Sequence, residues 1–274
     1  MIDLWISLSV LVAAVLLSEA TRRITSRLFA RASWLYLLEA ASTFQLCCCS
    51  QELKLLAEKA NLKPQPLIAL TLTYTITVVH LTTFRGAACN PVGVLDRVYR
   101  GIISGRAAVV LIACQFSAAL ASQFFAASVW SLGLSDVHVR QQKFGTRCFD
   151  PVGGTLLEAA AAELVGAFIM QAVVLNLHKV DAKLRVFCIA TLITTLSYAV
   201  GSISGSVLNP VLAFAIQFPC SGHTYLEYCF VYWLGPASGV ASCVLLVDKI
   251  LPFLSGKSSV GQDVATAAHK SKMQ

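Results

Sequence analysis

The tripeptides Asn90-Pro91-Val92 and Asn209-Pro210-Val211 stand 119 positions apart in a chain of 274 residues. Proline suits the first turn of a helix but breaks its interior, and asparagine is a favoured N-cap. Asn-Pro therefore marks a helix start. Each tripeptide opens a short apolar stretch, near residues 90–96 and 208–218. The sequence thus predicts two short helices that begin at matching motifs.

The composition around these motifs is typical of a membrane protein. Hydrophobic residues make up 57% of the chain, charged residues make up 13%, and the mean hydropathy is +0.71. Soluble domains carry roughly 45–50% apolar and about 25% charged residues, and they cannot hide this much apolar surface from water. Disordered, collagen-like, disulfide-scaffold and nucleic-acid-binding classes are therefore excluded. The spacing of the ten cysteines predicts no metal site, and we expect no cofactor.

Seven apolar runs reach the roughly 17–25 residues that cross a bilayer. They cover residues 4–20, 33–50, 67–84, 107–130, 158–177, 186–203 and 227–252. The two Asn-Pro stretches follow the third and sixth runs and are too short to cross. Run 4–20 lacks the basic flank that precedes a signal peptide, so we expect it to be an extra N-terminal helix that spans the bilayer.

The basic residues indicate how the chain is oriented. Alternate connections between the runs carry 15 of the 21 lysines and arginines on one face and six on the other. Cytoplasmic loops carry an excess of basic residues, so the richer face is expected to be cytosolic. The C-terminal tail belongs to that face. The net charge of +7 then reflects cytosolic loops rather than an anionic ligand.

The two motifs belong to an internal repeat. Glu39 lies 51 positions before Asn90 and Glu163 lies 46 before Asn209, each within a spanning run. Each half has three spanning segments, so the second half must be inserted upside down, as in many channels and transporters. We divide the chain into an N-terminal hydrophobic segment with its basic connection (1–32), a first repeat (33–130), a connecting loop (131–157), a second repeat (158–254) and a polar cytosolic tail (255–274).

An inverted repeat brings the two short helices together at the bilayer midplane. Irregular backbone at that depth is tolerated where it lines a wet cavity. Both helices point their positive N-terminal ends at the centre, and the amides of Asn90 and Asn209 are suited to donate hydrogen bonds to a permeant oxygen. Converging dipoles also repel protons and cations. Asn90, Pro91, Val92, Asn209, Pro210 and Val211 are therefore the predicted pore motif.

This pattern resembles the aquaporin family over residues 33–254. The segment from Gly201 to Pro210 resembles the family's second re-entrant loop, and the helix openings at Glu39 and Glu163 resemble the paired helix openings of its two halves. The resemblance implies an all-α membrane fold with six spanning helices and two re-entrant half-helices. It also implies a homotetramer in the lipid bilayer that conducts water and small neutral solutes.

The filter positions depart from the family. Valine replaces the usual alanine at Val92 and Val211, Leu212 replaces the arginine that follows the second motif, and Ser197 replaces the selectivity histidine. The predicted selectivity region comprises Leu70, Ser197, Ser206 and Leu212. An apolar constriction without a fixed cation predicts passage of glycerol or hydrogen peroxide beside water.

These departures resemble the unorthodox branch called superaquaporins, which carries a cysteine where Cys220 stands, nine residues after Val211. The segments 18–23 and 220–228 are more similar to the aquaporin-twelve subgroup, whereas the run Cys47–Cys49 is more similar to aquaporin-eleven. On balance these segments favour the aquaporin-twelve subgroup. The branch resides on intracellular membranes such as the endoplasmic reticulum. The C-terminal Lys270-Ser-Lys272-Met-Gln also resembles a dilysine retrieval signal.

Several alternatives remain at this stage. Ionisable groups in a membrane suggest proton relay, but we expect Glu39 and Glu163 to support the re-entrant loops by accepting backbone hydrogen bonds. Cys220 is expected to be a packing thiol, with a redox-sensitive thiol as the alternative. His80 and His138 suggest only interfacial polarity. A scaffold that keeps the fold without conducting is the second functional reading, an ion-coupled transporter the third, and no enzymatic arrangement is present.

Overall fold

A computed structural model describes residues 2–58, 66–143, 148 and 150–254, and this part of the chain is helical, with no strands. The helices are α1 (Ile2–Leu28), α2 (Arg31–Glu58), α3 (Pro66–Thr83), α4 (Pro91–Tyr99), α5 (Gly105–Ser131), α6 (Asp136–Lys143), α7 (Leu156–Asn176), α8 (Ala182–Ser204), α9 (Pro210–Ile216), α10 (Tyr225–Cys229), α11 (Gly235–Leu245) and α12 (Leu251–Leu254). A 3-10 turn, Leu177–Lys179, follows α7, and π-helical turns at Phe230–Leu234 and Leu246–Ile250 join α10, α11 and α12.

All seven predicted runs fall in helices. Five helices are long and apolar enough to cross a membrane, namely α1, α5, α7, α8 and the C-terminal helix Tyr225–Leu254, while Leu67–Thr83 in α3 is a shorter apolar helix. The 28-residue α2 is not among them. The polar side chains of α2 lower its hydropathy, which explains why it is not among the five. Four of them are buried against neighbouring helices, namely Glu39, Gln45, Gln51 and Glu52. A central helix can carry such groups when each meets a partner.

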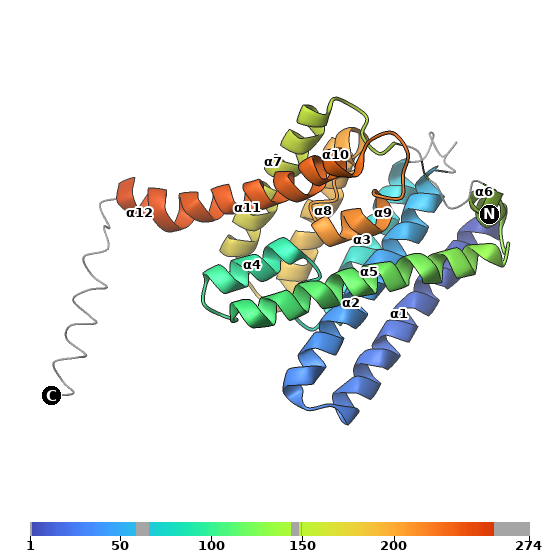
Figure 1. Cartoon of the computed structure of the whole chain (residues 1–274), viewed down its shortest axis with the longest axis horizontal. Coiled ribbons are helices and arrows are strands. Elements are labelled where there is room, and N and C mark those ends of the chain that lie inside the picture. The colour runs from blue at the N-terminus through green and yellow to red at the C-terminus, as the bar shows by residue number, and fades with distance from the viewer. Residues whose placement is uncertain (1, 59–65, 144–147, 149, 255–274) are drawn as a thin grey trace.

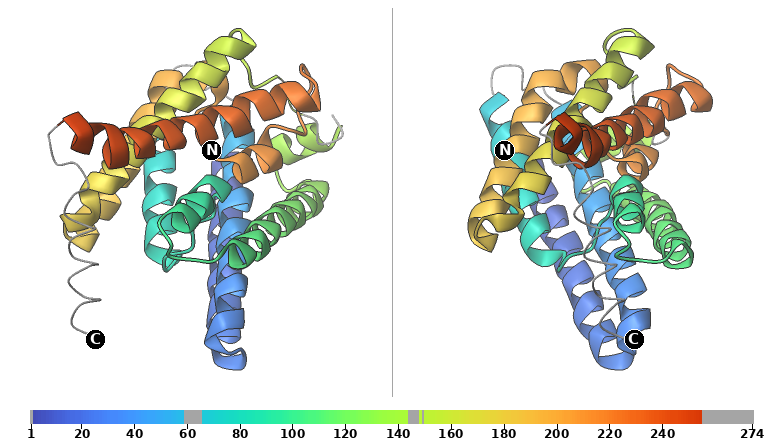
Figure 2. Two further views of the ribbon diagram at one scale, coloured as in Figure 1. Left: turned by 60° about the vertical axis from the view of Figure 1, so that its left-hand side comes forward. Right: turned by 90° about the vertical axis from the view of Figure 1, so that its left-hand side faces the viewer.

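The two repeats occupy α2–α5 and α7–α12, each with its half-helix in third place (Figure 1). The half-helices α4 and α9 contact each other, and both pack on α5. The helix α1 lies outside this scheme. It runs antiparallel beside α2, and the turn between them projects beyond the other helices (Figure 2).

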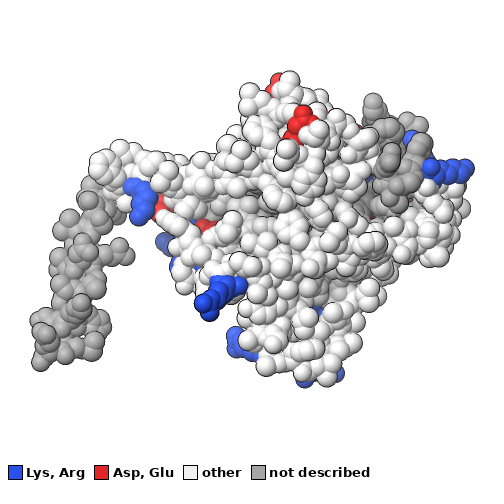
Figure 3. Space-filling view, viewed as in Figure 1, with Lys and Arg blue, Asp and Glu red and all other residues white. Residues whose placement is uncertain are grey.

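The surface matches a lipid environment. The face in Figure 3 is largely uncharged, with lysine and arginine side chains toward its edges. Large apolar side chains on the long helices are exposed, among them Val109, Phe124 and Tyr198. Exposed apolar area of this kind marks contact with lipid or another apolar partner.

A buried polar cluster fastens α1 and α6 to α2. The Glu52 carboxylate accepts hydrogen bonds from Ser7 Oγ at 2.5 Å and Trp130 Nε1 at 3.0 Å, and His138 Nε2 lies 3.0 Å from it. His138 is fully buried. The expectation that His138 is only interfacial is therefore wrong, because the histidine pairs with a carboxylate whose position in space the sequence alone did not reveal.

Candidate pore

The two Asn-Pro motifs meet and hold each other. Asn90 caps α4 by accepting the Val92 N–H at 3.0 Å, and Asn209 caps α9 by accepting the N–H groups of Val211 and Leu212. Each amide nitrogen then donates to the other motif. Asn90 Nδ2 bonds the Leu208 carbonyl at 3.1 Å, and Asn209 Nδ2 bonds the Cys89 carbonyl at 2.7 Å. An amide NH₂ has two hydrogens, so each retains one beyond this reciprocal pair.

The residue before each asparagine has the same unusual backbone. Cys89 has φ of +50° and Leu208 has φ of +53°. A side chain at positive φ costs roughly 1–3 kcal/mol and persists where its surroundings fix it. Here it turns both carbonyls toward the opposite motif, where the asparagines bond them. The matching strain in both halves reflects the inverted repeat.

Two buried glutamates supply that fixation. Glu39 accepts the Ala88 and Cys89 N–H groups at 3.0 and 2.6 Å, and also Gln115 Nε2 at 2.7 Å. Glu163 accepts the Val207 and Leu208 N–H groups at 3.0 and 2.6 Å, and also Ser204 Oγ at 2.6 Å. Both carboxylates thus lie behind the re-entrant loops, with their oxygens engaged by the protein.

A cavity of about 390 Å³ runs past the motifs. Of the predicted site residues, Asn90, Asn209, Ser197, Ser206 and Leu212 line it. Leu70, Pro91, Val92, Pro210, Val211 and Cys220 are not among its lining residues. No arginine, lysine, aspartate or glutamate of the described residues lines the cavity.

The motif valines lie behind the cavity wall. Val211 is fully buried and packs in a cluster with Cys47, Ala119 and Ala215, and Val92 is likewise buried. Small neighbours therefore accommodate the added methyl groups, as volume-conserving packing allows. Pro91 and Pro210 occupy the first turns of α4 and α9.

The helix α3 contributes cavity-lining residues that the sequence did not predict. Thr73, Thr77 and His80 all line the cavity. Their spacing of four and three places them on one helical face, which was the available signal within an otherwise apolar run. His80 is 5% exposed, and its Nε2 has no hydrogen-bond partner among the described residues. The expectation of interfacial polarity for His80 is therefore wrong.

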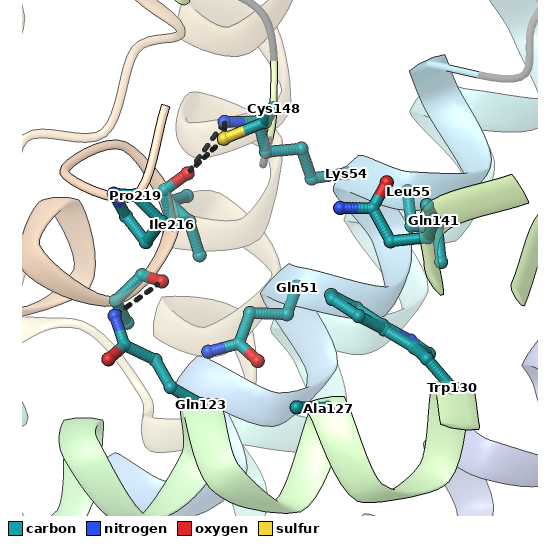
Figure 4. Close-up of a pocket in the computed structure, with 11 residues that line it drawn as sticks. Gln51, Lys54, Leu55, Gln123, Ala127, Trp130, Gln141, Cys148, Ile216 and Pro219 are labelled. Carbon is teal, nitrogen blue, oxygen red and sulfur yellow. Dashed lines mark hydrogen bonds between the residues drawn. The ribbon is translucent and has the colours of Figure 1, made fainter. Parts of the chain in front are cut away.

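Cys220 is neither of the thiols considered from the sequence. It forms a disulfide with Cys148, 72 positions away. Lys54 from α2 reaches the same place, where its Nζ donates to the Ile216 carbonyl at 2.6 Å and to Gln217 Oε1 at 2.5 Å and lies 3.0 Å from Cys220 Sγ. Figure 4 shows Lys54 and Cys148 converging on Ile216, beside a pocket of about 150 Å³ that Gln51, Gln123 and Gln141 also line. The carboxyl end of α9 is thus fixed by a cation and a covalent crosslink.

Within residues 2–58, 66–143, 148 and 150–254, no group of three or more His, Cys, Asp or Glu side chains is arranged to hold a metal ion. His223 instead lies 3.2 Å from Asp150 and 3.7 Å from Glu227. The cavity beside the motifs is lined by amides, hydroxyls, the His80 imidazole and apolar groups.

Comparison with known proteins identifies relatives along almost the whole chain. It is 34% identical to Aquaporin-11 of Homo sapiens over 261 residues, which covers 95% of both chains. It is 29% identical to Aquaporin-12 of Mus musculus, covering 93% of this chain and 89% of that protein. The chain is thus more similar to this aquaporin-11 than to this aquaporin-12, although segments 18–23 and 220–228 favour the aquaporin-twelve subgroup. No protein-family model matches.

Among solved structures, the aquaglyceroporin of Plasmodium falciparum superimposes with a TM-score of 0.59 at 16% identity. The match covers 80% of this chain and 97% of that one. At this level of identity the likeness supports the fold alone.

Proposed function

The chain belongs to the aquaporin family, and we propose that it is a passive transmembrane channel whose pore passes between Asn90 and Asn209. Aquaporin relatives and the aquaglyceroporin fold support a channel for water or small solutes. One observation carries the placement of the pore. The two asparagine amides hold each other across the motifs while both line a cavity that has no charged side chain among the described residues.

The cavity wall favours neutral solutes beside water. Leu212 and Ser197 occupy the positions where a strict water channel is expected to carry a cation and a histidine, and both line the cavity. A constriction with Leu212 in place of a guanidinium is more apolar, which suits the carbon skeleton of an alcohol. Ser197 and Ser206 offer hydroxyl groups for hydrogen bonds, and each asparagine can donate its remaining amide N–H to a solute oxygen. We infer that glycerol and hydrogen peroxide are among the solutes conducted.

Stopped-flow light scattering on proteoliposomes tests this function. Water and glycerol permeabilities of the wild-type protein are expected to exceed those of empty vesicles and to fall to background in the Asn90→Asp/Asn209→Asp double variant. Each substitution replaces the amide NH₂, which donates to a carbonyl of the other motif, with a carboxylate oxygen, which is an acceptor and cannot form that bond. Asn176→Asp, at an exposed asparagine on α7, is the matched control. Absence of flux from well-folded wild-type protein would overturn the proposal and favour the scaffold reading.

The disulfide supports the proposed orientation. Disulfides persist in oxidising compartments, and the Cys148–Cys220 bond lies in connections that the basic-residue count puts on the non-cytosolic face. We propose that this face is the lumen of the endoplasmic reticulum and that the C-terminus is cytosolic. Lys270 and Lys272 lie outside the described residues. Their replacement by serine is expected to shift a tagged protein to the cell surface under fluorescence microscopy.

A homotetramer is the proposed assembly. The exposed apolar faces of the long helices leave area for neighbouring copies within the bilayer. Crosslinking in detergent and native mass measurement are expected to give four copies per particle, and a monomeric particle that still conducts would refute this assembly.

A further inference from the structure

Because Leu212 replaces the arginine of the family's filter, another group has to exclude cations from the proposed pore. The cavity has no arginine or lysine among its described lining residues, and Leu212 supplies only apolar surface. Helix dipoles at the motifs provide partial positive charge. A full charge near the pore must therefore come from outside the cavity wall.

The extra helix α1 carries such a charge into the protein. Arg22 is fully buried. Its guanidinium donates to Gln45 Oε1 at 2.8 Å and to Glu19 Oε2 at 3.0 Å, and Ser42 Oγ lies 3.5 Å away. A buried guanidinium is retained only with partners of this kind.

The Glu19 carboxylate does not neutralise its surroundings. Besides Arg22 it binds Arg23 at 2.7 Å and Arg85, so three guanidiniums share one carboxylate and the cluster keeps two positive charges. Arg85 lies in the connection that leads to Asn90. Arg23 is 68% exposed, so solvent screens it most, while Arg22 lies in a low-dielectric interior where its field reaches furthest.

The cluster is adjacent to the pore wall. Gln45, which holds Arg22, donates to Thr83 Oγ1 of α3 at 3.1 Å. Thr83 lies in the chain between His80 and Phe84, which both line the cavity, and Arg85 directly follows Phe84. The His80 Nε2 is buried and has no hydrogen-bond partner among the described residues.

We propose that the Arg22–Glu19–Arg85 cluster, supplied by α1, is the pore's cation-excluding element, at the opposite mouth from the filter position that Leu212 occupies. This inference rests on the proposed channel function. It gives α1 a role in selectivity besides packing. The cluster repels protons and metal cations near His80 while leaving Leu212 and Ser197 free to admit neutral solutes.

The test measures water flux and cation leak on the same proteoliposomes. Arg22→Gln is expected to keep water permeability and to raise proton and sodium leak roughly tenfold, which is the order of change that one unit charge produces at a separation of about 10 Å and an effective dielectric constant of about 20. Arg27→Gln, at an exposed position on α1, is the matched control and is expected to leak like wild type. Adding Leu212→Arg to Arg22→Gln is expected to restore tight vesicles.

Arg85→Gln provides a second route if Arg22→Gln does not fold, because the Arg85 side chain is 38% exposed. It is expected to raise leak in the same direction. Variants at Arg22 or Arg85 that pass water yet stay as tight as wild type would overturn the inference, as would equal leak from Arg27→Gln. Wild-type protein that passes no water would instead overturn the proposed channel function.

Discussion

The two half-helices are alike where they begin and unlike where they end. Both begin with an asparagine cap behind a residue of positive φ, held by a glutamate. At its carboxyl end α4 has Arg100 beside Asp96 at 3.0 Å and Asp248 at 3.7 Å. The carboxyl end of α9 has Lys54 and the Cys148–Cys220 disulfide instead. The amino-terminal ends of α4 and α9 therefore share the features that the proposed central pore needs. Their carboxyl ends make different contacts, as is expected when the two ends lie toward opposite sides of the membrane.

The largest expected effect comes from the glutamates. Glu39→Gln and Glu163→Gln each keep one acceptor oxygen but leave a buried backbone N–H facing an amide NH₂, so we expect each to lower the free energy of unfolding by about 3 kcal/mol or more. Thermal unfolding in detergent measures this. Glu158→Gln, at an exposed capping box with Thr155, is the control and is expected to change the free energy of unfolding much less than either buried variant. Unequal losses of stability in the two variants would show that the amino-terminal ends of α4 and α9 are not equivalent.

Removing the disulfide is the next largest change. Cys148→Ser/Cys220→Ser is expected to lower stability by about 2–4 kcal/mol, because the bond closes a long loop in the unfolded chain. Unfolding of the wild type with and without a reducing agent checks the same quantity. Cys188→Ser, at a free and half-buried cysteine, is the control. Equal thermal midpoints for the double serine variant and wild type would show that the crosslink does not stabilise this end.

Lys54 is expected to contribute less. Lys54→Met removes the donor to the Ile216 carbonyl and to Gln217 Oε1 while keeping the aliphatic stem, so we expect a loss of about 2 kcal/mol. Measuring Lys54→Met in the Cys148→Ser/Cys220→Ser background gives the coupling between cation and crosslink. Strictly additive losses would mean that the two fasten α9 independently.

The features visible in sequence are those carried by local chemistry. Asn-Pro encodes a capped helix start wherever it stands, and its repetition with Glu39 and Glu163 upstream led to both re-entrant loops. The alternation of basic connections led to an orientation with which the disulfide is consistent. Each of these inferences needs only neighbours in the chain or a count along it.

The features missed depend on approach between distant segments. Cys148 and Cys220 are 72 positions apart, and ten cysteines give no pairing by themselves. The resemblance to the family predicts Leu70 as a selectivity residue, whereas Thr73 of the same helix lines the cavity. The lining face depends on how α3 is rotated against α8, which the sequence does not show. The sequence assigns Arg22 to a cytosolic connection between two apolar runs. Only the packing of α1 on α2 shows that it is buried.

The smallest expected effect separates the two caps. Asn209 accepts two backbone N–H groups and Asn90 accepts one, so Asn209→Ala is expected to cost about 2 kcal/mol and Asn90→Ala about 1 kcal/mol. Each variant also loses one cross-motif bond, so the difference reports capping when these two bonds contribute equally. Thermal unfolding of both variants and of Asn176→Ala measures it. A larger loss at Asn90 would mean that its bond to the Leu208 carbonyl outweighs the bond from Asn209 to Cys89, although the latter is shorter.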